Sequence, residues 1–207
     1  MTAVFPGLAF GLPFALTAEG TPPCAVGFDS GSVVLTSGPR SDLFVDPAGD
    51  GTGPDAGRFV GEPPAGDFTL RARVDVRFRS TFDAGVLLVY ASASVWAKLC
   101  FEFSPQGRPT VVTVVTRGTS DDSNSFEVNA TSIWLRITRS GRTWAFHAST
   151  SGIRWRLVRY FALGELGPGQ TARVGFLAQS PQGQSCRAVF DKIAFWPEAP
   201  ADLRDGS

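Results

Sequence analysis

A nine-residue segment, residues 95–103, combines three chemically useful side chains in an alternating pattern. The even positions hold Trp96, Lys98, Cys100 and Glu102, whereas the odd positions carry only apolar residues. Because side chains alternate across a strand, the pattern predicts a central strand with one core face and one polar face. An indole, an ammonium and a carboxylate on one face can bind a small polar molecule. The carboxylate and the ammonium could also carry out acid–base chemistry, which makes Glu102 and Lys98 the catalytic candidates.

Lys98 is one of only two lysines, since the other basic residues are arginines. Lysine is a compact charge whose pKa shifts readily on burial, so its use at a central position indicates a chemical role. The alternative is a structural ion pair on a solvated sheet face, in which Glu102 pairs with Lys98 or with an arginine. The pattern alone leaves both interpretations open.

Polar residues after the next predicted strand extend the candidate site. Arg117 follows a β-branched run and opens a polar segment, residues 118–125, which we expect to be a loop. Asp121 and Asp122 in this segment can accept hydrogen bonds from sugar hydroxyls. The segment lacks the spaced acidic pattern and the distal glutamate of a calcium-binding loop, so we predict no metal site.

The chain contains a single histidine, His147, which excludes sites that need two histidine ligands. His147 alternates with Ala145 and Ser149 on the side opposite the more aromatic face. We include it among the ligand-binding candidates, although a lone histidine on a strand more often makes an ordinary hydrogen bond. Cys100 is interpreted as packing rather than as a nucleophile.

Composition and charge exclude several functions. Nineteen basic and nineteen acidic residues give a formal net charge of zero, so no overall field favours nucleic acid or an anionic membrane. The chain has no Gly-rich phosphate-binding motif, and we expect no cofactor. The apolar segment 5–16 lacks a basic region before it and is interpreted as a first strand or a covering segment, so we expect a cytoplasmic protein. The expected partner is a small polar molecule or carbohydrate, and a protein partner is possible.

Period-two alternation predicts an all-β protein, a sandwich of two antiparallel sheets with about ten strands. We expect one domain over residues 1–207, with residues 46–66 as a long surface loop and residues 197–207 as a covering or frayed tail. The predicted core contains Phe68, Leu70, Leu87, Leu99, Phe101, Ile133, Leu135, Phe176 and Phe190.

Five ordered motifs, at residues 66–68, 81–88, 96–102, 114–122 and 178–183, resemble a family of domains of unknown function related to the yeast "regulation of enolase" protein. The resemblance covers about residues 43–196 and implies a concanavalin A-like jelly roll, in the superfamily of lectins and glucanases. The last motif adds Gln179 to the ligand-binding candidates. The family often has Trp after the Ser-Asp pair, whereas this chain reads Asp121-Asp122-Ser123-Asn124.

The resemblance implies architecture more directly than activity. Glycosidases of this superfamily use paired carboxylates on one strand, but none of the six glutamates lies within five residues of another. We therefore expect non-catalytic binding of a small, carbohydrate-like ligand on the concave sheet face. The alternatives are an enzyme acting on a sugar or similar molecule with Glu102 as acid or base, and a protein-interaction module.

Overall fold

A computed structural model describes residues 4–51 and 53–207, and almost all of its regular structure is strand. In chain order the elements are β1 (Val4–Phe5), the 3-10 helix η1 (Gly7–Phe10), β2 (Leu16–Glu19), β3 (Ala25–Asp29), β4 (Ser32–Thr36), β5 (Arg58–Gly61), β6 (Phe68–Arg77), β7 (Ala84–Ser92), β8 (Val95–Phe103), β9 (Pro109–Arg117), β10 (Thr119–Glu127), β11 (Ser132–Ser140), β12 (Thr143–Ser149), β13 (Arg156–Ala162), β14 (Arg173–Gln179) and β15 (Arg187–Trp196).

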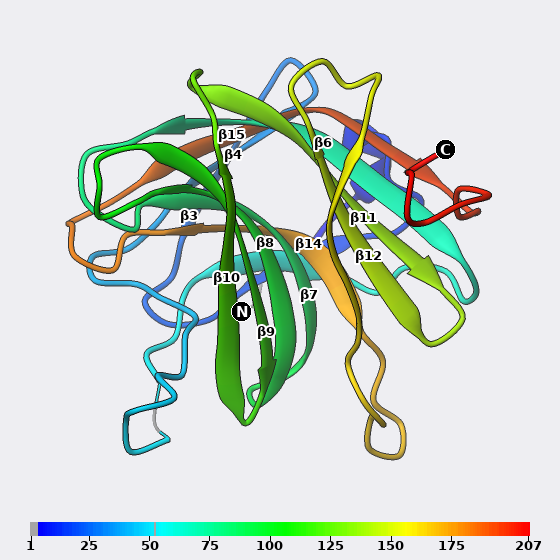
Figure 1. Ribbon diagram of the computed structural model, residues 1–207, viewed down its shortest axis with the longest axis horizontal. Helices are drawn as coiled ribbons and strands as arrows, with labels where there is room; N and C mark the ends of the chain where they lie inside the picture. Colours follow the sequence, from blue (N-terminus) through cyan, green and yellow to red (C-terminus); the bar gives the residue numbers. More distant parts are fainter. Residues whose placement is uncertain (1–3, 52) are drawn as a thin grey trace.

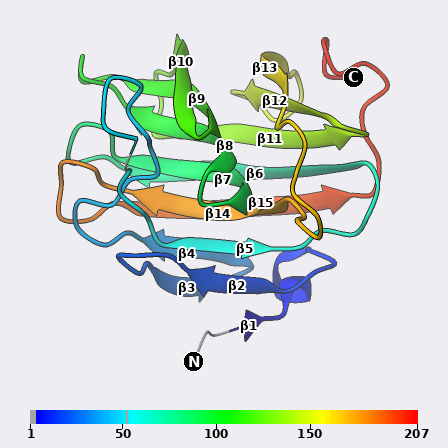
Figure 2. The same cartoon turned by 90° about the horizontal axis from the view of Figure 1, so that it is seen from below.

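The strands form two antiparallel sheets that pack face to face (Figure 1). The eight-stranded sheet has the order β1-β2-β5-β14-β7-β8-β9-β10, and the seven-stranded sheet has the order β13-β12-β11-β6-β15-β4-β3. Figure 2 shows β1 to β4 at one side of the molecule and the hairpins of β9 to β13 at the other. The predicted all-β sandwich is confirmed, because both sheets bury one face against the other.

The main core lies between the two sheets and includes all nine residues predicted for it, each at most 1% exposed. The alternation in β6 shows how the sequence produces this core. Phe68, Leu70 and Val74 point inward, while Arg71 and Arg73 occupy the intervening positions on the outer face. One face of the strand is therefore removed from water and the other keeps its polar groups near the surface.

The predicted loop at residues 118–125 is wrong, because this segment is strand β10 at the edge of the eight-stranded sheet. Backbone pairing with β9 holds it in register, for example Asp121 opposite Val115 and Asp122 opposite Val114. An edge strand with polar side chains can keep them in water, so polarity did not distinguish it from a loop.

The predicted surface loop at residues 46–66 is also wrong in part. It contains β5, whose four residues are all buried between β2 and β14. Four residues are too few for a recognisable alternation, and Gly61 allows the backbone of Ala15 to approach closely. The short strands β3 and β4 were likewise not predicted. With β5, β10 and the division of the first segment into β1 and β2, they bring the number of strands in the described residues to fifteen rather than about ten.

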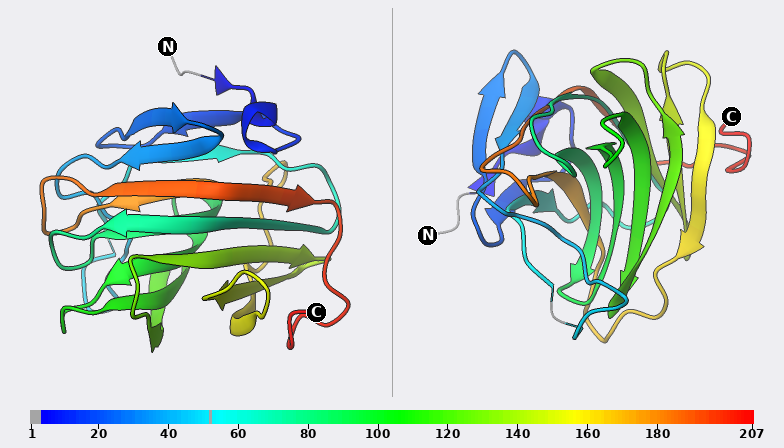
Figure 3. Two further views of the ribbon diagram at one scale, coloured as in Figure 1. Left: turned by 90° about the horizontal axis from the view of Figure 1, so that it is seen from above. Right: turned by 60° about the vertical axis from the view of Figure 1, so that its left-hand side comes forward.

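The tail after β15 runs past one end of the seven-stranded sheet, beside β6 and β11 (Figure 3, left). A nitrogen of the Arg136 side chain donates to the carbonyl of Gly206 over 2.9 Å, and Nε2 of His147 lies 2.8 Å from the carbonyl oxygen of Leu203. Within the described ranges, no helix is long and apolar enough to cross a membrane.

Candidate functional site

The outer face of the eight-stranded sheet is covered by a segment that we call the strap, residues 41–57, of which Thr52 lies outside the described residues. Ser41 forms an isolated bridge with Ser180 at one end of the sheet. Further along, the N–H of Val45 donates to Oγ of Ser120, and the N–H of Ser120 donates to the carbonyl of Val45. These contacts hold the strap across the strands (Figure 3, right).

Beneath the strap lies a second hydrophobic cluster, separate from the main core. Leu43, Val45 and Ala56 of the strap pack with Trp96 and Cys100 of β8. The predicted alternation of β8 is confirmed, because Ala97, Leu99 and Phe101 belong to the main core instead. The strap, however, makes the face of Trp96, Lys98 and Glu102 a buried one.

A cavity of about 200 Å³ lies between the strap and this face. Five polar side chains and four apolar ones line it: Asp42 and Phe44 from the strap, Phe82 from the turn before β7, Lys98 and Glu102 from β8, Val112 and Val114 from β9, Asp122 from β10, and Gln179 from β14. Segments from six parts of the chain therefore converge on one small space. We take this cavity as the candidate site.

Hydrogen bonds through Gln179 connect the two buried charged residues. Nζ of Lys98 donates to Oε1 of Gln179 over 2.9 Å and lies 3.3 Å from Oδ1 of Asp42. The amide nitrogen of Gln179 donates to the carbonyl of Phe82 over 3.3 Å and lies 3.5 Å from Oε2 of Glu102. The ion-pair partner of Lys98 is thus Asp42, and not Glu102 as the alternative interpretation of the sequence proposed.

Burial changes the acid–base properties of both groups. Desolvation raises the pKa of Glu102 to about 7, because the attraction of Lys98 only partly offsets it and Asp42 and Asp122 add repulsion. Desolvation also acts to lower the pKa of Lys98, but Asp42 and the other acidic groups nearby outweigh it and raise the pKa above its usual value. Lys98 therefore stays charged at neutral pH, while Glu102 can exchange a proton there.

The wall formed by Phe82 is fixed by a buried aspartate. Phe82 has a φ of 68°, a left-handed conformation that is unfavourable for a bulky residue. The carboxylate of the following residue, Asp83, accepts the N–H groups of Arg79 and Ser80 over 2.9 Å and the hydroxyl of Ser180 over 2.6 Å. These bonds compensate for the strain and hold the Phe82 carbonyl next to Gln179.

Four of the eight predicted site residues, Lys98, Glu102, Asp122 and Gln179, meet at this cavity. Trp96 shares their face but is 0% exposed under the strap, so it cannot stack on a ligand in this conformation. Nζ of Lys98 lies 5.7 Å from the centre of the Trp96 indole ring.

The other three predicted residues lie elsewhere. Arg117 is paired with Val95 on the opposite side of the sheet, and its guanidinium donates to the carbonyl of Ala162. Asp121 forms an ion pair with Arg159 at 2.8 Å. His147 is on the outer face of the other sheet, because β12 belongs to that layer.

Sequence reasoning missed Asp42, Phe44 and Phe82, as well as the two valines of β9. Asp42 and Phe44 alternate with the buried residues Leu43 and Val45, a weak period-two signal that was available. Nothing in that signal indicates which sheet the segment covers.

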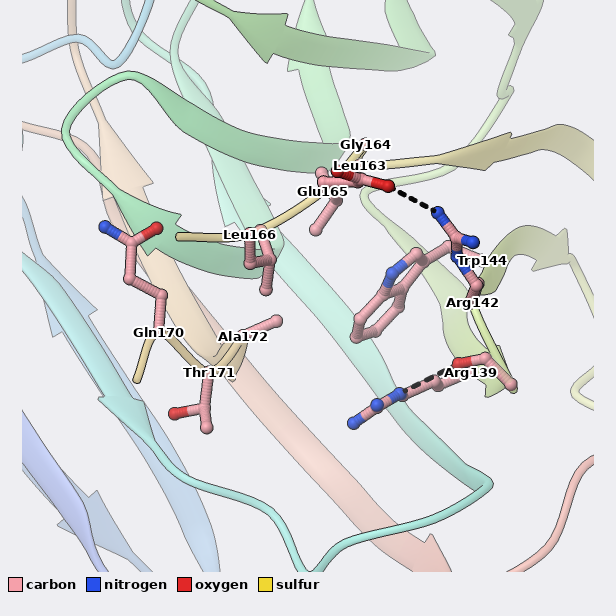
Figure 4. A pocket seen from close by; sticks show the side chains of 11 residues that line it. Arg139, Arg142, Trp144, Leu163, Gly164, Glu165, Leu166, Gln170, Thr171 and Ala172 are labelled. Atoms are coloured by element: carbon pink, nitrogen blue, oxygen red, sulfur yellow. Dashed lines mark hydrogen bonds and ion pairs between the residues drawn. The ribbon is translucent and has the colours of Figure 1, made fainter. Parts of the chain in front are cut away.

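A larger cavity of about 440 Å³ lies beside the hairpin of β11 and β12 and the segment 163–172 (Figure 4). Its charged groups satisfy one another at the surface: Arg142 pairs with Glu165 at 3.8 Å, and Arg139 donates to the carbonyl of Gly141. Both members of the ion pair are strongly exposed, so we consider the buried polar set beside Lys98 the stronger candidate. No group of acidic, His and Cys side chains in the described part of the chain is arranged to hold a metal ion.

Comparisons with solved structures show the same fold in proteins of different size. A functionally unknown protein from Saccharomyces cerevisiae is 24% identical with a TM-score of 0.75, covering 89% of this chain and 97% of that one. A GH43 protein, BlXynB, from Bacillus licheniformis is 16% identical with a TM-score of 0.65, covering 81% of this chain. A xylan β-1,4-xylosidase from Bacillus halodurans C-125 is 14% identical with a TM-score of 0.66, covering 83% of this chain.

This chain spans about a third of the length of BlXynB and of the xylosidase, 33% and 34% respectively. At these identities the likenesses show the fold alone. No curated protein matches the sequence significantly. A family model described as "Protein of unknown function (DUF1349)" matches residues 21–198, well over half of the sequence. The chain therefore belongs to this family, the proteins of unknown function DUF1349.

Proposed function

We propose that the protein binds a small, uncharged polyhydroxylated molecule of carbohydrate type in the cavity beneath the strap. The observation that carries this proposal is the convergence of Asp42, Lys98, Glu102, Asp122 and Gln179 on one cavity of about 200 Å³. A polyol can form hydrogen bonds with several of these polar groups at once without bringing a charge of its own.

The polar side chains of the cavity can both accept hydrogen bonds from hydroxyl groups and donate to them. Carboxylate oxygens of Asp42 and Asp122 accept hydrogen bonds from hydroxyls, and the ammonium of Lys98 donates to hydroxyl oxygens. Val112 and Val114 form an apolar wall that suits the C–H groups of a sugar ring. The surrounding carboxylates would repel an anionic ligand, which favours a neutral one.

The size of the cavity limits the ligand. At about 30 Å³ per water molecule, about 200 Å³ corresponds to six or seven waters. This is room for one monosaccharide unit and not for a chain of sugars. The likeness in fold to a GH43 protein and to a protein described as a xylan β-1,4-xylosidase makes pentoses reasonable first probes.

A catalytic role for Glu102 is the second candidate, and one observation favours it. A carboxyl group with a pKa raised to about 7 is suited to both donate and accept a proton at neutral pH. In that case Lys98 would tune Glu102, and turnover would depend on pH around this value.

Titration of the protein with D-xylose, L-arabinose, D-glucose and erythritol, followed by calorimetry and ligand-detected NMR, tests the proposal. The matched variants are Asp122→Asn, which changes the cavity wall, and Asp121→Asn, which changes the next residue on the opposite face. We expect Asp122→Asn to weaken binding by about tenfold, since one lost charged hydrogen bond costs about 1.5 kcal/mol. Asp121→Asn should leave the affinity unchanged.

Two results would contradict the proposal: no saturable binding of any of these polyols to the parent protein, or equal weakening by both variants. Release of nitrophenol from 4-nitrophenyl β-D-xyloside, lost in Glu102→Gln, would move the conclusion from binding to catalysis.

A further inference from the structure

Two arginines lie side by side on the outer face of the seven-stranded sheet, away from the proposed ligand cavity. Arg71 of β6 is directly paired with Arg136 of β11, and Arg136 is paired in turn with His147 of β12. Like charges at directly opposed positions of an antiparallel pair are destabilising. The arrangement therefore needs a physical reason.

These residues hold most of the unsatisfied buried nitrogens in the described part of the chain. Only four buried side-chain nitrogens there lack a hydrogen-bond partner: Nε of Arg71, Nε of Arg136, Nδ1 of His147 and Nε1 of Trp96. Three of the four belong to the row of Arg71, Arg136 and His147. Arg136 is only 7% exposed, so its guanidinium is withdrawn from bulk water.

Acidic partners are missing here, although other arginines of this protein have them. Arg73, two residues further along β6, donates to Asp191 over 2.9 Å, and Arg58 pairs with both Glu19 and Asp55. Among the described residues, no carboxylate lies within ion-pair distance of Arg71 or Arg136. The exposed residue Glu198 lines the same region but forms no ion pair with either arginine.

Indole rings surround the two guanidinium groups. The guanidinium of Arg71 lies 5.3 Å from the ring centre of Trp134 and 4.8 Å from that of Trp196, and the guanidinium of Arg136 lies 4.4 Å from that of Trp155. Stacking fixes the orientation of the guanidinium groups. One terminal nitrogen of Arg136 donates to the carbonyl of Gly206, whereas Nε of each arginine has no hydrogen-bond partner in the described structure.

A cavity of about 280 Å³ lies against both arginines. Besides them it is lined by Thr69, Trp155, Trp196 and residues of the C-terminal tail. We propose that this cavity binds a small organic anion, with the guanidinium groups of Arg71 and Arg136 holding its carboxylate or phosphoryl oxygens and the indoles contacting its carbon skeleton. Planar guanidinium groups suit both oxyanions because they donate two parallel hydrogen bonds.

The electrostatics of the row support this assignment. Burial and the nearby Arg71 lower the pKa of Arg136 to about 10, and burial together with Arg136 lowers the pKa of His147 to about 4. His147 is therefore neutral at physiological pH, so the positive charge facing the cavity resides on the two arginines. A bound anion would relieve their repulsion.

The test is a calorimetric titration with inorganic phosphate, acetate and benzoate, at an ionic strength held constant with sodium chloride. The variant Arg71→Met keeps an unbranched apolar stem and removes an unpaired charge, so it should fold. The matched control Arg73→Met removes a paired arginine from the same face of the same strand. We expect Arg71→Met to weaken binding by at least about tenfold, and Arg73→Met to leave it within about twofold.

A preference for phosphate identifies a phosphoryl ligand, and a preference for benzoate over acetate identifies an aromatic carboxylate; either supports the site. The inference is overturned if none of the three anions saturates the parent protein, or if Arg73→Met weakens binding as much as Arg71→Met does. Asp122→Asn should leave anion binding unchanged, which separates this site from the polyol cavity.

Discussion

Nζ of Lys98, at the centre of the eight-stranded sheet, lies 3.3 Å from Oδ1 of Asp42, which belongs to the strap. This ion pair joins two segments that are 56 residues apart in the chain. Lys98 is 1% exposed, and its only other hydrogen-bond partner in the described structure is Gln179. The pair therefore both places the strap over the sheet and completes the polar wall of the cavity.

The coupling between Lys98 and Asp42 can be measured with a double-mutant cycle. Lys98→Met should destabilise the fold strongly, because it leaves Asp42 and Gln179 without their buried donor. Asp42→Asn should cost less, since the Asp42 side chain is partly exposed. We expect a coupling energy of about 1–3 kcal/mol in urea unfolding. Additive single effects would show that the two groups do not interact.

The stability of the protein should depend on the protonation of Glu102. Its pKa is about 7 in the folded state against an ordinary value of 4.5, so between these values the folded state binds the proton more tightly than the unfolded chain does. Glu102 therefore does not lower the free energy of unfolding below about pH 4.5. Its destabilising effect grows as the pH rises and is complete above about pH 7.

Replacement of Glu102 by Gln removes this dependence. We expect Glu102→Gln to be more stable than the parent by roughly 3 kcal/mol at pH 8 and about equally stable at pH 4.5, from denaturant unfolding at both values. Glu127→Gln, an exposed change on β10, is the control and should show no such difference. A constant difference between Glu102→Gln and the parent at both pH values would contradict the raised pKa.

Ser120 should be important for holding the strap. Its hydroxyl accepts the N–H of Val45 over 2.8 Å and lies 2.8 Å from the hydroxyl of Thr116. Ser120→Ala leaves a buried N–H without a partner, which costs about 1–3 kcal/mol. Hydrogen exchange at Val45 should accelerate accordingly, while the exposed change Ser123→Ala should alter stability by less than about 0.5 kcal/mol. Unchanged exchange in Ser120→Ala would show that other contacts hold the strap.

Gly175 in β14 provides a test of the sheet packing. A Cβ at this position would lie 2.1 Å from the carbonyl oxygen of Phe59 in the neighbouring strand β5, and backbone atoms cannot move aside easily. Gly175→Ala should therefore destabilise the protein by at least about 2 kcal/mol in thermal or urea unfolding. Gly27→Ala in β3 meets nothing closer than 3.9 Å and should be nearly neutral. Similar stability of the two variants would contradict the pairing of β5 with β14.

The sequence by itself determined the class of fold and the faces of its long strands. Alternation in β6 and β8 assigned core and outer positions correctly, because a strand has only two faces and burial selects the apolar one. It also placed Lys98 and Glu102 on one face, and the family motifs added Gln179, which lines the same cavity.

The tertiary structure decided which segment covers that face and which residues are paired across neighbouring strands. The strap reaches the sheet through a few hydrogen bonds between residues such as Val45 and Ser120, far apart in the sequence, so no local pattern reveals that it buries Trp96 and supplies Asp42. The pairing of Arg71 with Arg136 depends on the register of β6 against β11, which the packing of the core fixes. Local patterns specify the face of a residue, whereas its neighbours depend on long-range packing.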